Sequence, residues 1–307
     1  MFRIIKGTKI DFISQRKKAY ILSAVLVLLG IACFFAILFG KANLGIDFAG
    51  GTMVQGWFES DVDIADLRSV LSEAGFDAAY MTHLEGREHG STFLIRVKVG
   101  SEGGQTVSEQ IVGAIKAGFP GNVFTLDSVH EVGPSIGREL ERTAIWMVLL
   151  AIAGILIYIW IRFDLRFGVA ATIATFHDVL AVLGIFFIFN KEISLLVVVA
   201  LLTLAGYSLS DSVVVFDRIR ENLKTFRRKG DFISTINLSI NEVLGRTLMT
   251  SLTTLTVVIV LLLAGGEILR DFALALMIGI LVGTYSSVFV ASPIIVEWEN
   301  RSPKRFK

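Results

Sequence analysis

Six stretches of predominantly apolar residues, each long enough to cross a lipid bilayer, dominate the sequence. A helix needs about 20 such residues to cross a hydrocarbon core of about 30 Å. Lipid offers no partner for backbone N–H and C=O groups, so each stretch is predicted to be helical. The six predicted transmembrane helices are Tyr20–Phe39, Thr143–Ile161, Phe167–Phe189, Ile193–Phe216, Thr247–Ala264 and Phe272–Ile295. The first stretch is too long for the apolar region of a signal peptide, and no small-residue cleavage site follows it, so we expect it to be retained.

The composition agrees with a polytopic membrane protein and excludes several other classes. Hydrophobic residues make up 53% of the chain and charged residues only 19%, whereas soluble domains are about 25% charged. The 29 basic and 28 acidic residues nearly cancel, so no global charge would attract nucleic acid and we expect no such partner. Cys33 is the one cysteine, which excludes an intrachain disulfide and a cysteine-based zinc site. We expect neither a metal nor another cofactor.

The distribution of Lys and Arg predicts the orientation in the membrane. Cytoplasmic loops carry an excess of these residues. With the N-terminus inside, 18 of them fall on the cytoplasmic side and only Lys191 and Arg270 lie in the two short outer loops. We therefore expect a multi-pass protein with both termini in the cytoplasm. The predicted cytoplasmic segments are an arm over residues 1–19, a loop over 217–246 and a tail over 296–307, and helices two to six occupy 143–295.

One soluble domain, residues 40–142, is predicted on the outer side of the membrane. Apolar spacing of three and four alternates with spacing of two along it. The predicted elements are a strand Thr52–Phe58, a helix Asp61–Ala74, strands Asp77–Leu84 and Ser91–Val99 joined by a turn from Gly86 to Gly90, a helix Gln105–Gly118 and a strand Asn122–Val132. The order βαββαβ is the ferredoxin-like arrangement of an α+β domain. His83, His89 and His130 are scattered, so we interpret them as ordinary surface or edge residues.

Two glycine-containing segments flank this domain. Leu44–Thr52 reads LGIDFAGGT and Glu131–Glu139 reads EVGPSIGRE. Glycine supplies positive φ in tight turns, and hinges use the same residues. Tight turns and hinges therefore remain equal interpretations. The residues that would form either are Gly45, Asp47, Gly50, Gly51, Gly133, Pro134 and Gly137.

A few ionisable residues fall inside the predicted membrane helices. A charge at mid-bilayer costs about 2.5–3.5 kcal/mol on insertion scales, which makes such residues functional candidates. His177 and Asp178 lie midway along the third helix, and Asp211 lies among small hydroxyl residues in the fourth. Arg246 begins the fifth helix and is followed by a hydroxyl-rich stretch. Asp178 is difficult to explain without a partner, whereas a neutral His177 packs among helices at little cost.

Asp211 and Arg246 are predicted to lie at one depth. Each is 18 residues from the outer end of its helix, about 27 Å inward at 1.5 Å per residue. Adjacent antiparallel helices would then pair the two charges, with hydrogen bonds extended by Ser210, Ser212, Thr247 and Thr250. The alternative is that both lie at the cytoplasmic interface, where Arg extends its head to water and Asp caps a helix.

Such a pair would respond to an ion gradient. A carboxylate beside an Arg pairs when charged and releases the Arg when neutral, so two helix packings become available. A proton that crosses a potential of about 150 mV releases about 3.5 kcal/mol. This free energy is enough to shift the equilibrium of the domain a few-hundredfold. The sequence thus predicts an ion-responsive helix bundle and an external domain that the bundle would move.

Four motifs, in this order, carry a specific resemblance. They are LGIDFAGGT at 44–52, FHDV at 176–179, GYSLSDSVVVFDRIREN at 206–222 and RTLMTSLTT at 246–254. Together they resemble the SecD/SecF family of protein-export membrane proteins, relatives of the RND transporters, over almost the whole chain. The fold implied is six transmembrane helices of the RND half-transporter type with one large external loop.

The resemblance implies a function and partners. It implies a subunit of the export machinery in the bacterial inner membrane, driven by a proton or sodium gradient, that helps to draw an unfolded polypeptide outward. The implied partners are a SecD-type subunit, the SecYEG channel, the translocating polypeptide and membrane lipid. The family's important membrane charges fall on Asp211 and Arg246, and Ser208, Ser210 and Ser212 lie where relatives have small or polar residues.

Three alternatives compete with this interpretation. A half-transporter of RND type that exports a small or lipidic substrate by proton antiport predicts a polar cavity at mid-membrane. A membrane scaffold predicts that Asp211→Asn leaves function intact. A membrane hydrolase would need a paired acid and nucleophile at usable spacing, which the sequence lacks, so we expect no enzymatic activity.

Overall fold

The computed structural model describes residues 8–77, 79–84, 90–98, 106–225 and 232–301. The chain divides into two compact units, one made of residues 1–43 with 147–307 and the other of residues 44–146. Several sequence predictions fall partly or wholly outside the described residues. Among them are most of the turn from Gly86, His89, residues Val99 and Gln105 at the ends of two predicted elements, and parts of the predicted cytoplasmic arm, loop and tail.

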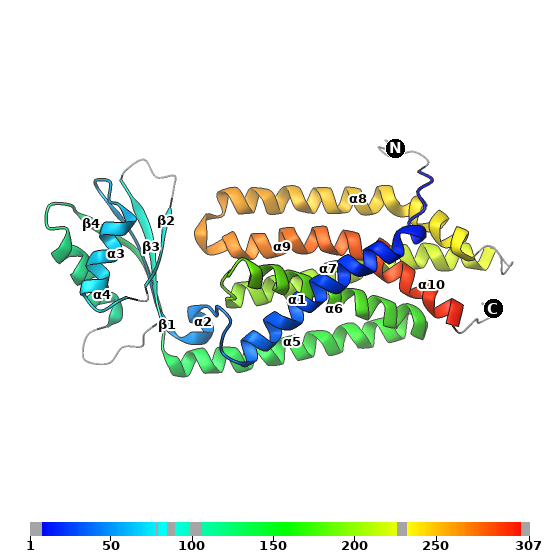
Figure 1. Cartoon of the computed structure of the whole chain (residues 1–307), viewed down its shortest axis with the longest axis horizontal. Coiled ribbons are helices and arrows are strands. Elements are labelled where there is room, and N and C mark those ends of the chain that lie inside the picture. The colour runs from blue at the N-terminus through cyan, green and yellow to red at the C-terminus, as the bar shows by residue number, and fades with distance from the viewer. Residues whose placement is uncertain (1–7, 78, 85–89, 99–105, 226–231, 302–307) are drawn as a thin grey trace. The chain divides into compact units, whose positions relative to one another are not determined.

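The unit of residues 44–146 contains the predicted ferredoxin-like domain (Figure 1). After a short helix α2 (Ile46–Ala49), its elements are β1 (Gly51–Phe58), α3 (Ile64–Glu73), β2 (Tyr80–Leu84), β3 (Thr92–Val97), α4 (Val107–Gly118) and β4 (Phe124–Val132). The sheet order is β2-β3-β1-β4 with every pairing antiparallel. The predicted βαββαβ order is therefore confirmed.

Local sequence signals explain this domain. Buried and partly exposed residues alternate along β1 from Val54 onward, as expected for a strand with one face on a core. Helix α4 begins at a capping box between Thr106 and Glu109. The core between sheet and helices is apolar, and Phe58, which is fully buried, makes an edge-to-face contact with Phe93 at 5.9 Å between ring centroids.

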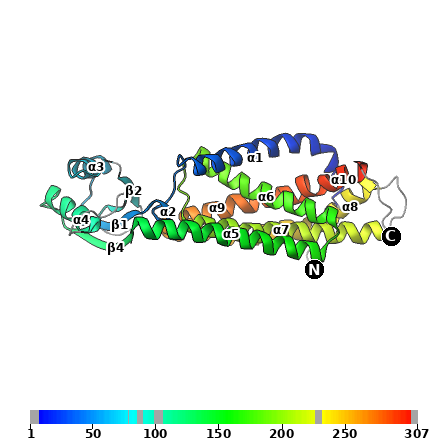
Figure 2. The ribbon, with the colours of Figure 1, turned by 90° about the horizontal axis from the view of Figure 1, so that it is seen from below.

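The other unit contains the membrane helices, shown in two views in Figures 1 and 2. Six helices are long and apolar enough to cross a membrane. The elements are η1 (Ile13–Gln15) with α1 (Arg16–Leu38), α5 (Pro134–Arg162), α6 (Leu165–Ile188), α7 (Leu195–Thr225), α8 (Phe232–Ala264), and α9 (Gly266–Ser286) continued through a π-helical turn η3 (Ser287–Ala291) into α10 (Ser292–Arg301). The protein is thus a polytopic helical membrane protein with one α+β domain.

Helices α6, α7 and α9 form the centre of the bundle. In the most apolar part of α6 and of α7, 50% of the residues are buried, and 56% are buried in that of the span from α9 through α10. The corresponding shares are 11% for α5 and 17% for α8. Helix α1 packs on α6 at a crossing of two glycines (Figure 2). A Cβ atom at Gly184 would lie 2.7 Å from the backbone nitrogen of Gly30, so only glycine permits this approach.

We expect Gly184→Leu to destabilise the bundle by about 1–3 kcal/mol, the usual cost of overpacking. The matched control is Gly154→Leu in α5, where a Cβ atom would meet nothing within 4 Å. The thermal unfolding midpoint of the purified full chain in detergent measures the difference. Equal midpoints for the two variants would contradict the close approach of α1 and α6.

The described part of the predicted cytoplasmic loop 217–246 is helical, and the side of the membrane on which it lies stays a prediction. Helix α7 continues to Thr225 and α8 begins at Phe232. Ile236, Ile240 and Val243 recur at helical spacing and are buried in the same core as Leu223 of α7. Polar residues such as Ser234, Asn237 and Asn241 interrupt this pattern, so no continuous apolar stretch marks the segment. Likewise α5 begins nine residues before Thr143, and α10 carries residues 296–301 of the predicted tail.

Candidate functional site

Helices α7 and α8 enclose a cavity of about 310 Å³ that contains both predicted membrane charges. Asp211 lies on α7 and Arg246 on α8, so the structure brings them to one site, as the depth argument expects. The full lining is Tyr207, Ser210, Asp211, Val214, Arg246, Thr247, Thr250, Thr253 and Thr254. Val214 is the one aliphatic member of this set, and each of the other lining residues carries a polar group.

The two charges are not in contact. No ion pair of 4.0 Å or less joins these two described residues, so the predicted direct pairing was wrong. The Asp211 side chain is 7% exposed, and its Oδ2 atom has no hydrogen-bond partner in the described part of the chain. Arg246 is exposed. The cavity is thus lined by a buried carboxylate and by an exposed cation that do not form an ion pair.

The hydroxyl groups of α8 line the rest of the cavity. Thr250 Oγ1 donates to the carbonyl of Thr247 at 2.8 Å, and Thr254 Oγ1 donates to that of Thr250 at 2.9 Å. Because each hydroxyl uses its proton on the helix backbone, its oxygen remains able to accept a hydrogen bond from a group in the cavity. Thr247 Oγ1 is buried and has no partner among the described residues. A cavity with these oxygens beside a carboxylate is suited to water, a proton carrier or a small cation.

A second polar cluster lies at the centre of the bundle. Asp178, which is 0% exposed, shares a hydrogen bond with His177 Nδ1 at 2.8 Å through Oδ1. Its Oδ2 accepts from Ser286 Oγ of α9 at 2.7 Å and from Ser208 Oγ of α7. This carboxylate therefore ties α6, α7 and α9 together, which supplies the partner that the sequence required. His177 Nε2 is buried without a hydrogen-bond partner in the described structure.

The predicted site residues thus divide between two places. Asp211, Arg246, Ser210, Thr247 and Thr250 line the cavity. Ser208 belongs instead to the Asp178 cluster, one helical turn from Asp211 on α7. The Ser212 hydroxyl is buried with no hydrogen-bond partner among the described residues.

Sequence reasoning missed Ser286, which donates to Asp178. The signal was present, because Thr284, Tyr285, Ser286 and Ser287 form a polar interruption in the otherwise apolar sixth stretch. A second missed connection runs through Ser251, whose hydroxyl accepts from Tyr207 Oη at 3.3 Å and lies 2.7 Å from Thr284 Oγ1. This connection links α7, α8 and α9 with polar groups.

The first glycine segment packs closely within the unit of residues 44–146. Gly50 and Gly51 have φ of 75° and 147°, which a residue with Cβ rarely adopts. Gly45 has φ of −68°, so its backbone conformation does not require glycine. Asp47 Oδ1 lies 3.9 Å from Nε2 of His130, whose side chain is 58% exposed at the edge strand β4.

The second segment is a helix start, so its interpretation as a turn over Glu131–Glu139 was wrong. Gly133 precedes α5 and Pro134 occupies its first position, where the missing N–H of proline is tolerated. Gly137 lies in the first turn, where a Cβ atom would be 2.9 Å from the Phe48 carbonyl oxygen. The two segments therefore touch each other, and their role as hinges stays a prediction.

Comparisons with known proteins match these features. Residues 111–301 match the family model described as protein export membrane protein SecD/SecF, C-terminal, and residues 35–55 match the SecD/SecF GG motif. The protein translocase subunit SecF of Thermodesulfovibrio yellowstonii is 50% identical over 297 residues, which cover 96% of this chain and 97% of the relative. The subunit of the same name from Rhodothermus marinus is 40% identical over 312 residues, with coverage of 99% and 97%.

Two solved structures of SecDF are similar to this chain in fold. The crystal structure of SecDF, a translocon-associated membrane protein from Thermus thermophilus, matches with a TM-score of 0.82 and 38% identity over 98% of this chain. SecDF in its super-membrane-facing form matches with a TM-score of 0.67 and 36% identity. This chain spans 40% of the length of each SecDF chain.

Six membrane helices, a ferredoxin-like domain and a hydroxyl-lined cavity with two ionisable residues define a polytopic helical membrane protein with one α+β domain. The family match covers most of the chain, and the relatives exceed 30% identity over almost its full length. The chain belongs to the SecD/SecF family of protein-export membrane proteins.

Proposed function

We propose that this chain is a subunit of a bacterial protein translocase, a transport component that uses the transmembrane ion gradient to help complete the export of unfolded polypeptides. The relatives named as translocase subunits support the export role. The cavity between α7 and α8 supports the coupling role, because it holds a buried carboxylate and an exposed cation at one site. This cavity is the observation on which the proposal rests.

The proposed cycle begins with an ion that enters the cavity. A proton or sodium ion at Asp211 offsets the cost of a buried carboxylate without a partner. Ion release restores the negative charge, which attracts Arg246 from α8 across the cavity. The bundle then alternates between two packings of α7 against α8, and these packings drive the external domain. One charge at 150 mV supplies about 3.5 kcal/mol to this equilibrium.

The proposed partners are a SecD-type subunit, the SecYEG channel and the exported polypeptide. This chain matches only 40% of SecDF, which leaves room for a partner of like architecture. Helices α5 and α8 are largely exposed in this chain, and they provide apolar surface for lipid and for such a partner. We further propose that both termini face the cytoplasm of a cell whose inner membrane holds the complex, as the distribution of Lys and Arg predicts.

The test of the proposal is gradient-dependent release of a precursor at the outer face of vesicles that contain the complete export complex. We expect Arg246→Met to reduce the gradient-stimulated part of release about tenfold or more, since removal of the cation leaves a charged Asp211 without its attraction across the cavity. The matched control is Arg270→Met, because Arg270 is 57% exposed and pairs with Glu267 away from the cavity. Equal release by the two variants would refute the coupling role of the cavity.

A further inference from the structure

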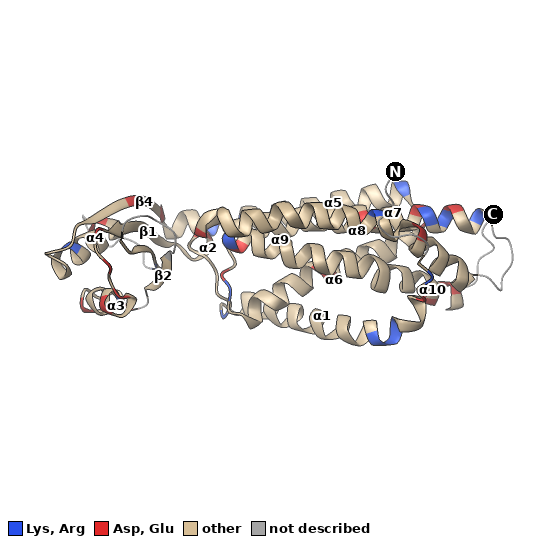
Figure 3. Cartoon of the chain, turned by 90° about the horizontal axis from the view of Figure 1, so that it is seen from above, with Lys and Arg blue, Asp and Glu red and all other residues tan. Residues whose placement is uncertain are grey.

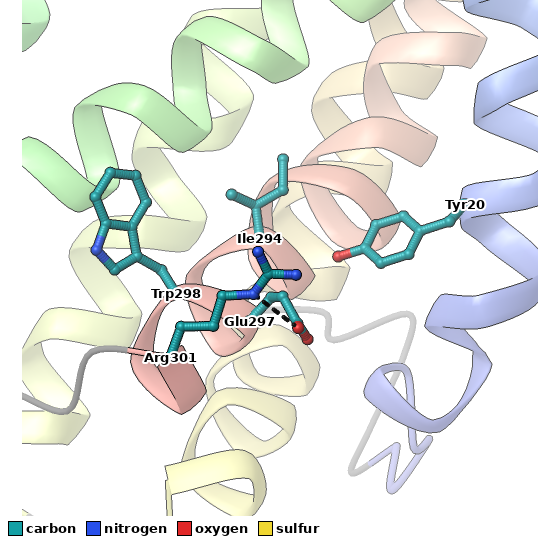
Figure 4. Close-up of a pocket in the computed structure, with 5 residues that line it drawn as sticks. All are labelled: Tyr20, Ile294, Glu297, Trp298 and Arg301. Atoms are coloured by element: carbon teal, nitrogen blue, oxygen red, sulfur yellow. Dashed lines mark hydrogen bonds and ion pairs between the residues drawn. The ribbon is translucent and has the colours of Figure 1, made fainter.

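A second cavity, of about 350 Å³, lies between α1 and α10 in the helix bundle (Figure 4). Its lining residues are Tyr20, Ile294, Glu297, Trp298 and Arg301. Figure 4 shows the Tyr20 hydroxyl pointing from α1 toward α10, which supplies the other four side chains. The volume lies within the range of small-molecule sites, about 300–1,000 Å³. The proposed export function makes no use of this cavity.

The cavity lies at the level of the lipid headgroups. Helices α9 and α10 form one span over Gly266–Arg301 of 36 residues, about 54 Å long at 1.5 Å per residue, which exceeds the hydrocarbon core by far. Its charged end, which carries Glu297 and Arg301, must therefore leave the core. Tyr20 follows the basic start of α1, and Figure 3 shows charged residues at both places.

The side chains around the cavity are those of an interfacial site for an anion. Tyr and Trp prefer the membrane–water interface, where their apolar rings and polar tips are both satisfied. Arg301 is 81% exposed and is held by Glu297 at 3.4 Å. Arg16 lies four residues before Tyr20 on α1, the spacing at which side chains of a helix are neighbours, and its guanidinium donates to the Ile13 carbonyl at 3.1 Å. Lys17, three residues before Tyr20, lies on the same face of α1.

In the lining of the cavity the charges of Glu297 and Arg301 balance, and an excess of positive charge comes from the basic start of α1 beside it. Arg16, Lys17 and Arg301 are opposed by Glu297, whereas the nearby Glu299 is engaged by Arg166. An anion that combines a charged head with an apolar tail would match both the cations and the apolar walls formed by Ile294 and the aromatic rings. In the membrane that surrounds this protein, anionic lipid meets this description and is present at high concentration.

We propose that this cavity binds the headgroup of an anionic glycerophospholipid. Arg301 and the cations of α1 bind the phosphate, the Tyr20 and Trp298 rings lie beside the glycerol, and an acyl chain runs along Ile294 toward the membrane core. The bound lipid joins the first and last membrane helices of the chain at this interface. The site belongs to a lipid rather than to a soluble phosphate, because aromatic and apolar groups form most of its lining.

Native mass spectrometry of the purified full chain, titrated with dioleoylphosphatidylglycerol or dioleoylphosphatidylcholine, tests the site. We expect preferential retention of phosphatidylglycerol, and about tenfold weaker retention in Arg301→Gln, since one charge-assisted hydrogen bond is worth about that much. Lys224→Gln removes an exposed cation from the end of α7 and is the matched control, with an expected change of about twofold or less because salt screens distant charges.

Further arms of the experiment separate the outcomes. Trp298→Leu should weaken retention of both lipids while the chain stays monodisperse on gel filtration, and soluble glycerol 1-phosphate should not displace bound lipid. Equal retention of the two lipids, or equal effects of Arg301→Gln and Lys224→Gln, would overturn the site. Displacement by glycerol 1-phosphate would overturn its assignment to a lipid. Each of these results is independent of gradient-dependent export.

Discussion

Asp211→Asn should abolish the gradient-stimulated part of precursor release while release without a gradient persists. The substitution keeps the shape of the side chain but removes its ability to carry a charge that an ion neutralises. A gradient of about 150 mV supplies about 3.5 kcal/mol per charge, which shifts the equilibrium between the two helix packings a few-hundredfold. In the variant this contribution to release should disappear. The measurement is precursor release from vesicles with the complete export complex, with and without an imposed gradient.

The matched control is Asp217→Asn, a second carboxylate on the same helix. Asp217 is 43% exposed and pairs with Arg162 Nη2 at 3.0 Å rather than with any group of the cavity. This variant should release precursor at the normal gradient-dependent rate. Separate proton and sodium gradients identify the coupling ion, because only the ion that reaches Asp211 should stimulate release. Full stimulation of Asp211→Asn would favour a scaffold in which the membrane charges serve packing alone.

The fold was largely predictable because its signals are local. A continuous apolar stretch marks each membrane helix. In the external domain, segments with apolar residues three or four positions apart alternate with segments in which they are two apart, which marks its helices and strands. These signals gave all six spans and the βαββαβ order. Helix ends were less certain, since α8 begins fifteen residues before Thr247, on an amphipathic segment in which polar residues interrupt the apolar ones.

The site was predictable only at the level of elements. Counting residues from the outer helix ends placed Asp211 and Arg246 at one depth, and both line one cavity. A residue count does not give the direction of a side chain, so it could not predict that Asp211 and Arg246 make no direct contact. Ser286 is 108 residues from Asp178, and no local rule connects two positions so far apart. Contacts of this kind depend on how α6, α7 and α9 pack together.

Asp178→Ala should produce the largest loss of stability among single changes in the membrane bundle. The Asp178 carboxylate is fully buried and accepts hydrogen bonds from Ser208 and Ser286 while it shares one with His177. Its removal takes a hydrogen-bond partner from His177, Ser208 and Ser286, and only Ser286 has a further described acceptor, the carbonyl of Gly283. Unsatisfied buried groups cost about 1–3 kcal/mol each in proteins, and hydrogen bonds inside membranes average about 0.6 kcal/mol, so we expect a loss of about 2–5 kcal/mol.

Two further variants distinguish the loss of the Asp178 hydrogen bonds from the effect of the void that a smaller side chain leaves. Asp178→Asn keeps an acceptor oxygen at nearly the same position, so it should retain a substantial part of the stability that Asp178→Ala loses. Ser286→Ala removes one donor and leaves the carboxylate two contacts, so it should cost less than Asp178→Ala. Unfolding of the purified full chain in mixed micelles at several denaturant concentrations measures each difference. If Ala and Asn at position 178 are equally stable, the carboxylate does not hold α6, α7 and α9 together through its hydrogen bonds, and shape alone fixes their packing.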